Sequence, residues 1–169
     1  YIIFSVRFCR DFHGLFNNAD FLAGNDFANY WTAGHLALEG NIGALFDFNG
    51  YHAAQEALFN HKLANFYNWS YPPALIPWLL WLGPFSYPVA LVLWLLATFA
   101  LYACAVAAKR RDPWILSLIL FLAPSSLVNI FHGQNGFLTA ALLVGGLRLL
   151  SSRPATAGVL FGFLIFKPH

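Results

Sequence analysis

The stretch "VALVLWLLATFALYACAVAA", from Val89 to Ala108, decides the fold because it is apolar and carries no charge. A helix needs about 20 apolar residues to cross the hydrocarbon layer of a membrane, and this stretch is long enough to do so. The whole chain agrees, since 59% of its residues are hydrophobic and only 9% are charged, whereas a soluble domain carries roughly a quarter charged residues. The sequence therefore predicts an integral membrane protein. A net charge of +2 gives no reason to expect a nucleic-acid partner.

Other apolar stretches surround this one and predict an all-α, polytopic bundle of transmembrane helices. The predicted membrane segments are residues 74–108, 114–128, 137–150 and 154–166. The first is interrupted by "GPFSYP" (83–88), so it crosses the membrane either once, after a short re-entrant piece, or twice as a hairpin. A single crossing is preferred because it gathers the candidate polar residues on one side. We expect residues 1–169 to be part of one membrane domain, in a fragment whose first span is partly or wholly missing before Tyr1.

Basic residues gather at two turns of this arrangement. They are Lys109, Arg110 and Arg111 in the first turn, and Arg148 and Arg153 in the second. Two crossings separate the turns, so both lie on the same side, which the positive-inside rule makes cytoplasmic. Residues 132–135 and 167–169 then fall on the opposite, external face.

Residues from about 10 to 73 are the least lipid-like part of the chain and predict an external segment. "DFANYWTAGHLALEG" (26–40) places small and apolar residues at helical spacing, with Gly40 as a natural stop. "YHAAQEALFNHKLANF" (51–66) suggests a second amphipathic helix. Such helices commonly lie in the plane of the membrane interface. The alternative is a solvated loop with helical turns.

Polar groups near a membrane are costly unless they are partnered, which makes them candidates for function. Asp26 either caps the start of the helix that follows it or acts as a general base. Partial desolvation at an interface would raise the pKa of such a carboxylate towards a useful range. Asp20 is the rival acid in the sequence, and Asp11 is a weaker one.

A second group of residues suits a sugar phosphate carried on a lipid. Lys167 follows an apolar run, so it either snorkels to the interface or presents a cation to a phosphate. His132 and His169 either join such a site or mark wet helix ends. Gln134 and Asn135 either cap the next helix or hydrogen-bond a sugar hydroxyl. The aromatic residues that either stack on a sugar ring or anchor the chain at the interface are Trp31, Trp69 and Tyr71.

Taken together and in order, these residues resemble glycosyltransferase family 87. This is a polyprenol-phosphate-dependent group, first catalogued as a domain of unknown function, that includes the phosphatidylinositol-mannoside mannosyltransferases of mycobacteria. The resemblance covers nearly the whole chain and rests on "DFANYWTAGHLALEGNIGALFD" (26–47), "YPPALIPWLLWLGPFSYPVALVLW" (71–94) and "HGQNGFLTAALLVGGLRLLSSRPATAGVLFGFLIFKP" (132–168). The last block is the most specific. Two departures stand out, since Phe46 replaces the more usual tyrosine and His169 stands where a glutamine is commonly expected.

The resemblance implies a many-spanning helical enzyme of the C-type kind, in the cell envelope, with its active site on the external (periplasmic) face of a bacterial inner membrane. It implies the transfer of a hexose, mannose above all, from a polyprenyl phosphate to a lipid or glycan acceptor with inversion. Asp26 takes the position of the catalytic acid, and Lys167 and His169 take that of the donor-phosphate site. The residues that would bind substrate are His132, Gln134, Asn135, Tyr71 and Trp31.

No cofactor is expected. Asp20 and Asp26 could hold a cation, but no recognisable metal-ligand spacing supports it. Cys9 and Cys104 lie in different settings, so neither a disulfide nor a Cys-x-x-Cys metal site is expected. The partners expected are the sugar donor, the acceptor and membrane lipids. Two alternatives come from other classes, a transporter or flippase for lipids or small molecules, and a non-catalytic membrane scaffold. A transporter normally has internal repeats or broken helices near the bilayer midplane, and no convincing repeat is visible in the sequence.

Overall fold

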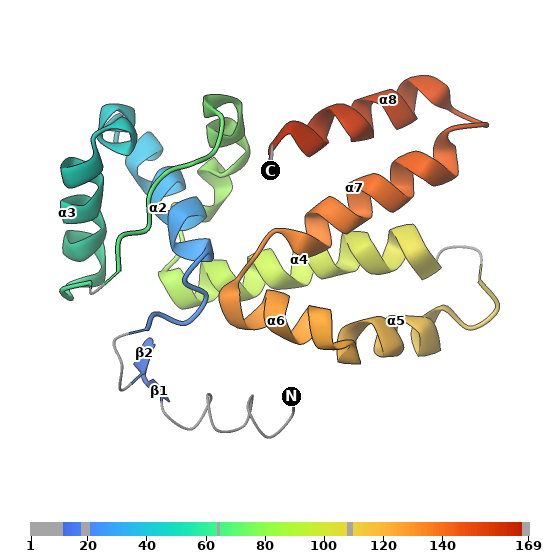
Figure 1. Cartoon of the computed structure of the whole chain (residues 1–169), viewed down its shortest axis with the longest axis horizontal. Coiled ribbons are helices and arrows are strands. Elements are labelled where there is room, and N and C mark those ends of the chain that lie inside the picture. The colour runs from blue at the N-terminus through green and yellow to red at the C-terminus, as the bar shows by residue number, and fades with distance from the viewer. Residues whose placement is uncertain (1–11, 18–20, 64, 108–109, 167–169) are drawn as a thin grey trace. The chain divides into compact units, whose positions relative to one another are not determined.

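The computed structural model describes residues 12–17, 21–63, 65–107 and 110–166, which fall into two compact units. Unit 1 comprises residues 1–92 and 131–133, and unit 2 comprises residues 93–130 and 134–169. The described part of the chain is mainly helical, as predicted (Figure 1).

The elements of unit 1 begin with a short antiparallel hairpin and continue as helices. They are β1 (Phe12–His13), β2 (Phe16–Asn17), α2 (Phe27–Leu38), η1 (Ile42–Phe46), α3 (Phe48–Phe59), η2 (Pro73–Trp78) and η3 (Leu80–Leu82), where η marks a 3-10 helix. Unit 2 contains α5 (Pro113–Leu122), α7 (Gly136–Leu149), α8 (Pro154–Gly162) and η4 (Phe163–Phe166). Both α4 (Tyr87–Ala107) and α6 (Pro124–His132) contribute residues to each unit.

Helix α2 is the central helix of unit 1. It begins directly after Asp26 and ends before Gly40, whose φ of +75° is the left-handed conformation expected at a helix stop. Most of its residues are buried, including Phe27, Tyr30 and Ala33. The predicted helix is therefore confirmed, but it is enclosed by protein on nearly every side. It is not the surface helix with one apolar face that the sequence suggested.

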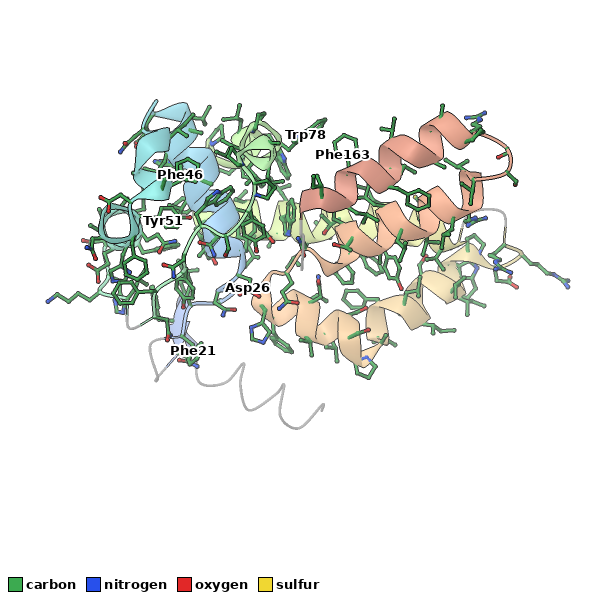
Figure 2. All side chains as sticks on the ribbon, turned by 45° about the horizontal axis from the view of Figure 1, so that its top comes forward. Phe21, Asp26, Phe46, Tyr51, Trp78 and Phe163 are labelled. Atoms are coloured by element: carbon green, nitrogen blue, oxygen red, sulfur yellow. The ribbon has the colours of Figure 1, made fainter. Side chains whose placement is uncertain are left out.

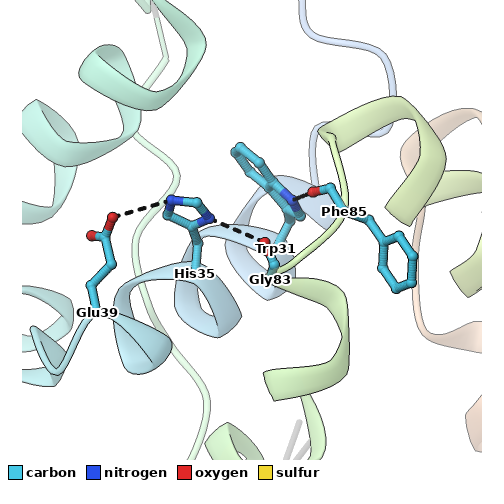
Figure 3. Close-up of polar contacts among 5 residues, drawn as sticks. All are labelled: Trp31, His35, Glu39, Gly83 and Phe85. Atoms are coloured by element: carbon cyan, nitrogen blue, oxygen red, sulfur yellow. Dashed lines mark hydrogen bonds and ion pairs between the residues drawn. The ribbon is translucent and has the colours of Figure 1, made fainter.

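The turn that precedes α4 is held against α2 by side chains of α2. Trp31 Nε1 donates a hydrogen bond to the carbonyl oxygen of Phe85 at 2.9 Å (Figure 3). His35 Nδ1 lies 3.2 Å from the carbonyl oxygen of Gly83, and its Nε2 lies 3.3 Å from a carboxylate oxygen of Glu39. The contacts of Trp31 and His35 provide partners for backbone carbonyls of a turn that has no sheet or helix to pair with.

Gly34 lets α2 approach η3 closely, and its replacement by alanine is expected to destabilise unit 1. An added Cβ would overlap the carbonyl oxygen of Leu79, which is backbone and cannot move aside. Overpacking of this kind costs about 1–3 kcal/mol, which should lower the melting temperature of the purified protein. Gly158→Ala is the matched control because it also lies in a helix but has nothing within 4 Å of the added Cβ. Equal melting temperatures for the two variants would show that α2 and η3 are not packed in this way.

Helix α3 has one buried face, as the sequence predicted for the second helix of the external segment. Tyr51 and Gln55 are its buried residues. The helix ends at Asn60, whose φ of 47° is left-handed, and the following amide of His61 bonds back to the carbonyl oxygen of Glu56 at 3.2 Å. The predicted helix over 51–66 is therefore too long at its end and starts too late.

Helix α4 is the one described helix that is long and apolar enough by itself to cross a membrane. Its 21 residues carry large apolar side chains on the surface, namely Val89, Val92, Leu96 and Leu101. Only the two short 3-10 helices η2 and η3 occupy residues 73–82. For the described part of residues 74–108, the structure therefore favours a single long helix with a short irregular start over a hairpin of two spans.

The membrane segment predicted over residues 114–128 stays a prediction, and the structure shows a break within it. The chain bends by 65° between α5 and α6, at a break where Ala123 is extended (ψ 140°). Pro124 causes the break because it has no N–H to donate and disfavours helical geometry in the residue before it. If the bent pair is one span, the described residues hold two candidate spans. Helix α7 and the α8–η4 pair are shorter, so the full polytopic bundle stays a prediction.

The two basic turns lie at the same end of unit 2, as the sequence predicted. Arg148, near the end of α7, donates hydrogen bonds to the carbonyl oxygens of Ala105 and Val106 in the last turn of α4. A cation placed there also complements the negative end of the helix dipole. Arg110 and Arg111 follow within a few residues and are exposed.

Candidate active site around Asp26

Asp26 is half-buried at the start of α2 (Figure 2). Its backbone N–H donates to the carbonyl oxygen of His132 at 3.0 Å, and the N–H of Gly24 donates to that of Phe131 at 3.1 Å. The Asp26 side chain makes no capping hydrogen bond to α2. The interpretation of this residue as a helix cap alone is therefore not supported, because the carboxylate is not used for that purpose.

The structure brings His132 to Asp26 and its neighbour Asn25, across more than a hundred residues of sequence. His132 Nδ1 lies 2.8 Å from Asn25 Oδ1. Because an amide oxygen can only accept, Nδ1 carries the proton in this contact. In the neutral imidazole, Nε2 is then the nitrogen that can accept a hydrogen bond.

Two glycines allow these segments to come together. Gly24 and Gly133 both have left-handed φ angles, of +67° and +63°. A Cβ on Gly133 would lie 2.6 Å from the Cβ of Phe27 and 3.2 Å from the Cα of Gly24. The "HGQN" turn therefore needs glycine at its second position, both for conformation and for space.

Three tyrosine side chains lie close enough to Asp26 for its charge to affect them. Tyr30 donates a hydrogen bond to the Tyr71 hydroxyl at 2.9 Å. Burial raises the pKa of Tyr30, and the nearby Tyr71 hydroxyl and Asp26 carboxylate raise it further. Burial also raises the pKa of Tyr71. The hydrogen bond from Tyr30 lowers this pKa by a smaller amount, and the charge of Asp26 raises it further. Burial and the charge of Asp26 likewise raise the pKa of Tyr67.

These phenols stay protonated at neutral pH, because even an unperturbed tyrosine has a pKa near 10. The tyrosine hydroxyls near Asp26 are thus neutral. Of these tyrosines, sequence analysis proposed only Tyr71 for the site. Tyr30 could have been found by helical spacing, since it lies one turn after Asp26 on α2. Tyr67 has no comparable signal.

Trp31 lies in the core of unit 1. It is 6% exposed, its ring centroid is 5.4 Å from those of Phe59 and Tyr87, and its N–H is taken by the carbonyl of Phe85. The predicted stacking of Trp31 on a sugar ring would need an open ring face. The structure instead gives Trp31 a packing role.

The other predicted site residues fall in unit 2 or outside the described residues. The backbone oxygen of Gln134 accepts a hydrogen bond from Trp94 Nε1 at 3.4 Å. Asn135 precedes α7 at its N-cap, makes no side-chain capping bond, and is 5% exposed. Lys167 and His169 lie outside the described residues, as do the rival acids Asp11 and Asp20. The structure thus joins Asp26, Tyr71 and His132 in unit 1.

A half-buried carboxylate among neutral hydroxyls can accept a proton from a substrate hydroxyl, which is general-base chemistry. Across the described ranges, no group of three or more His, Cys, Asp or Glu side chains is arranged to hold a metal ion. The described residues thus combine a candidate general base with one helix that is long and apolar enough to cross a membrane.

Comparison with protein families identifies the chain more closely. Residues 69–169, more than half of the chain, match glycosyltransferase family 87. The chain belongs to this family, as its sequence resemblance predicted, and the family consists of membrane enzymes that transfer sugars. The matched region includes Tyr71 and His132, whereas Asp26 precedes it. No curated protein and no solved structure matches the chain.

Proposed function

We propose that the chain transfers mannose from a polyprenyl phosphate to a hydroxyl group of a lipid or glycan acceptor, with inversion at the anomeric carbon. The observation that carries the proposal is the Asp26 cluster, in which a half-buried aspartate lies near protonated tyrosines and its backbone N–H bonds to His132. Such a cluster is suited to a hydroxyl nucleophile because it offers one proton acceptor and several neutral hydrogen-bonding groups.

In the proposed reaction, Asp26 takes the proton of the acceptor hydroxyl as its oxygen forms a bond to the anomeric carbon. The bond from that carbon to the phosphate oxygen breaks at the same time, and the phosphate leaves with the electron pair. Charge builds up on the departing phosphate, so fixed cations there lower the barrier. Lys167 and His169 are proposed for this role on the basis of family resemblance.

The remaining residues are proposed to hold the substrates. Tyr71 and His132 are proposed to hydrogen-bond sugar or acceptor hydroxyls near Asp26, with Nε2 of His132 as the acceptor. Gln134 and Asn135 follow in the same turn of sequence and are proposed to bind substrate as well. The reaction is proposed to occur on the external face of a bacterial inner membrane. The shared end of the two basic turns supports this orientation, since such turns favour the cytoplasm.

The test uses the full-length protein in membranes that contain endogenous acceptors. Polyprenyl phosphate carrying radiolabelled mannose is supplied, and polyprenyl phosphate carrying labelled glucose serves as the matched control. Label is expected to move from the mannose donor into a lipid or glycan product, and much less from the glucose donor. A transporter would leave the label on the donor. Label transferred only from glucose, or from neither donor, would refute the proposed sugar or the proposed donor class.

A further inference from the structure

Asn25 lies between two backbone hydrogen bonds that join its segment to the last residues of α6. The N–H of Gly24 donates to the carbonyl oxygen of Phe131 at 3.1 Å, and the N–H of Asp26 donates to that of His132 at 3.0 Å. All these residues belong to unit 1. The backbone of Asn25 is therefore held beside the end of α6 from both sides, which limits where its side chain can reach.

A buried tyrosine holds the same segment just before Asn25. The hydroxyl of Tyr87 lies 2.7 Å from the carbonyl oxygen of Ala23 and 2.8 Å from that of Gly24, and Tyr87 is 3% exposed. A hydroxyl has one proton, so it donates to one of these two oxygens at a time. The segment that carries Asn25 is thus fixed by backbone and side-chain bonds within unit 1.

The Asn25 side chain meets the ring of His132. The distance from Asn25 Oδ1 to His132 Nδ1 is 2.8 Å, within the range of a well-formed N–H···O hydrogen bond. Both residues are half-buried, so water competes less for this bond than at an exposed site, and part of His132 remains accessible. The amide oxygen only accepts, so the bond requires a proton on Nδ1. In the neutral ring, Nε2 then has a lone pair and no proton.

The position of this proton decides which substrate group the ring can bind. An unprotonated Nε2 accepts a hydrogen bond from a hydroxyl group, whereas it has no proton to donate to a phosphate oxygen. In histidines that act in a site, the partner of one ring nitrogen commonly sets the protonation of the other and orients the ring. Asn25 is that partner for His132.

We propose that Asn25 is a positioning residue that holds His132 in this tautomer, so that His132 binds a hydroxyl group of the sugar or the acceptor and not the donor phosphate. The effect on sugar transfer rests on the proposed function, whereas the tautomer itself does not. Asn25 acts through His132 and needs no contact with the substrate.

The tautomer is measured by nitrogen NMR on the full-length protein in phosphatidylcholine nanodiscs, with isotope-labelled histidine. The measurement is made at about pH 8, where a histidine of ordinary pKa is neutral. The signals of His132 are those that disappear in His132→Gln. Transfer of labelled mannose from polyprenyl phosphate and the melting temperature are recorded for the same proteins.

Three variants test the role of the amide oxygen. Asn25→Leu removes the acceptor at similar volume, whereas Asn25→Asp keeps an oxygen that can accept from Nδ1. Asn41→Leu is the matched control, because Asn41 is an exposed asparagine of the same unit whose side chain makes no capping bond.

The wild type, Asn25→Asp and Asn41→Leu are expected to carry the proton on Nδ1 and to transfer sugar at similar rates. Asn25→Leu is expected to populate both tautomers and to transfer sugar about 10- to 100-fold more slowly, the loss produced when comparable partners of metal-binding histidines are removed. Protonation of Nε2 in the wild type would overturn the proposal. Unchanged transfer by Asn25→Leu would do so as well.

Two further outcomes separate positioning from structure. If Asn25→Leu transferred sugar slowly while it kept the tautomer, or if Asn25→Asp kept the tautomer but not the transfer, Asn25 would have only a structural role. If the wild type transferred no mannose, the proposed reaction would fail together with the role of Asn25 in it. The NMR measurement would still decide whether Asn25 fixes the tautomer, because it needs no sugar donor.

Discussion

Asp26→Asn is expected to lower sugar transfer by about 10²- to 10⁴-fold, the usual contribution of a general base. Asparagine has nearly the same shape but cannot take a proton from the acceptor hydroxyl. The fold should survive, because asparagine keeps the size of the side chain and the contact to His132 uses the backbone N–H. The measurement is kcat/KM with a labelled donor, in membranes that contain equal amounts of each protein.

Asp47→Asn is the matched control for this experiment. Asp47 also precedes a helix, α3, and also makes no side-chain capping bond, but it is exposed and has no place in the tyrosine cluster. It should transfer sugar at the wild-type rate. If Asp26→Asn transferred sugar as well as Asp47→Asn, the base would have to be sought at Asp20 or His132.

Gly133→Ala is expected to have the second large effect, on stability and on activity together. Alanine in the left-handed conformation costs about 1–2 kcal/mol. The overlap of the new Cβ with the Cβ of Phe27, at 2.6 Å, adds about 1–3 kcal/mol more because neither backbone can give way easily. Any relief moves the turn that carries His132 away from Asp26, so transfer should fall in the protein that remains folded. Thermal unfolding and initial transfer rates measure the two effects.

Gly40→Ala distinguishes the cost of the left-handed backbone conformation from the cost of steric overlap. Gly40 has a φ of +75°, close to that of Gly133, but nothing lies within 4 Å of an added Cβ. It should lose only the conformational part of the stability and keep the transfer rate. Similar losses in both variants would show that the close packing of Gly133 on Phe27 has no energetic weight.

The sequence predicted the features that depend on neighbouring residues. The start of α2 after Asp26, its stop at Gly40 and the long helix that ends at Ala107 all follow from local signals such as capping position, glycine conformation and an unbroken apolar run. The shared end of the basic turns followed from counting crossings, and the contact of Arg148 with the end of α4 agrees with it.

The features that the sequence did not predict depend on distant contacts or on one overlooked residue. The burial of α2 comes from partners such as Leu79 and Tyr87, which no pattern within α2 identifies. The break at Pro124 was visible in principle. The predicted membrane segment over 114–128 rests on its mean apolarity, which does not register the missing N–H of one proline.

The bond between Arg148 and the last carbonyls of α4 has a consequence for the biogenesis of the chain. Helix α4 is synthesised before α7. Its C-terminal carbonyls therefore have no bond to Arg148 until about forty more residues have been made. Until Arg148 arrives, water or lipid headgroups have to solvate those carbonyls, which keeps that end of α4 at an aqueous boundary. The arginine then links the C-terminal ends of α4 and α7 within unit 2.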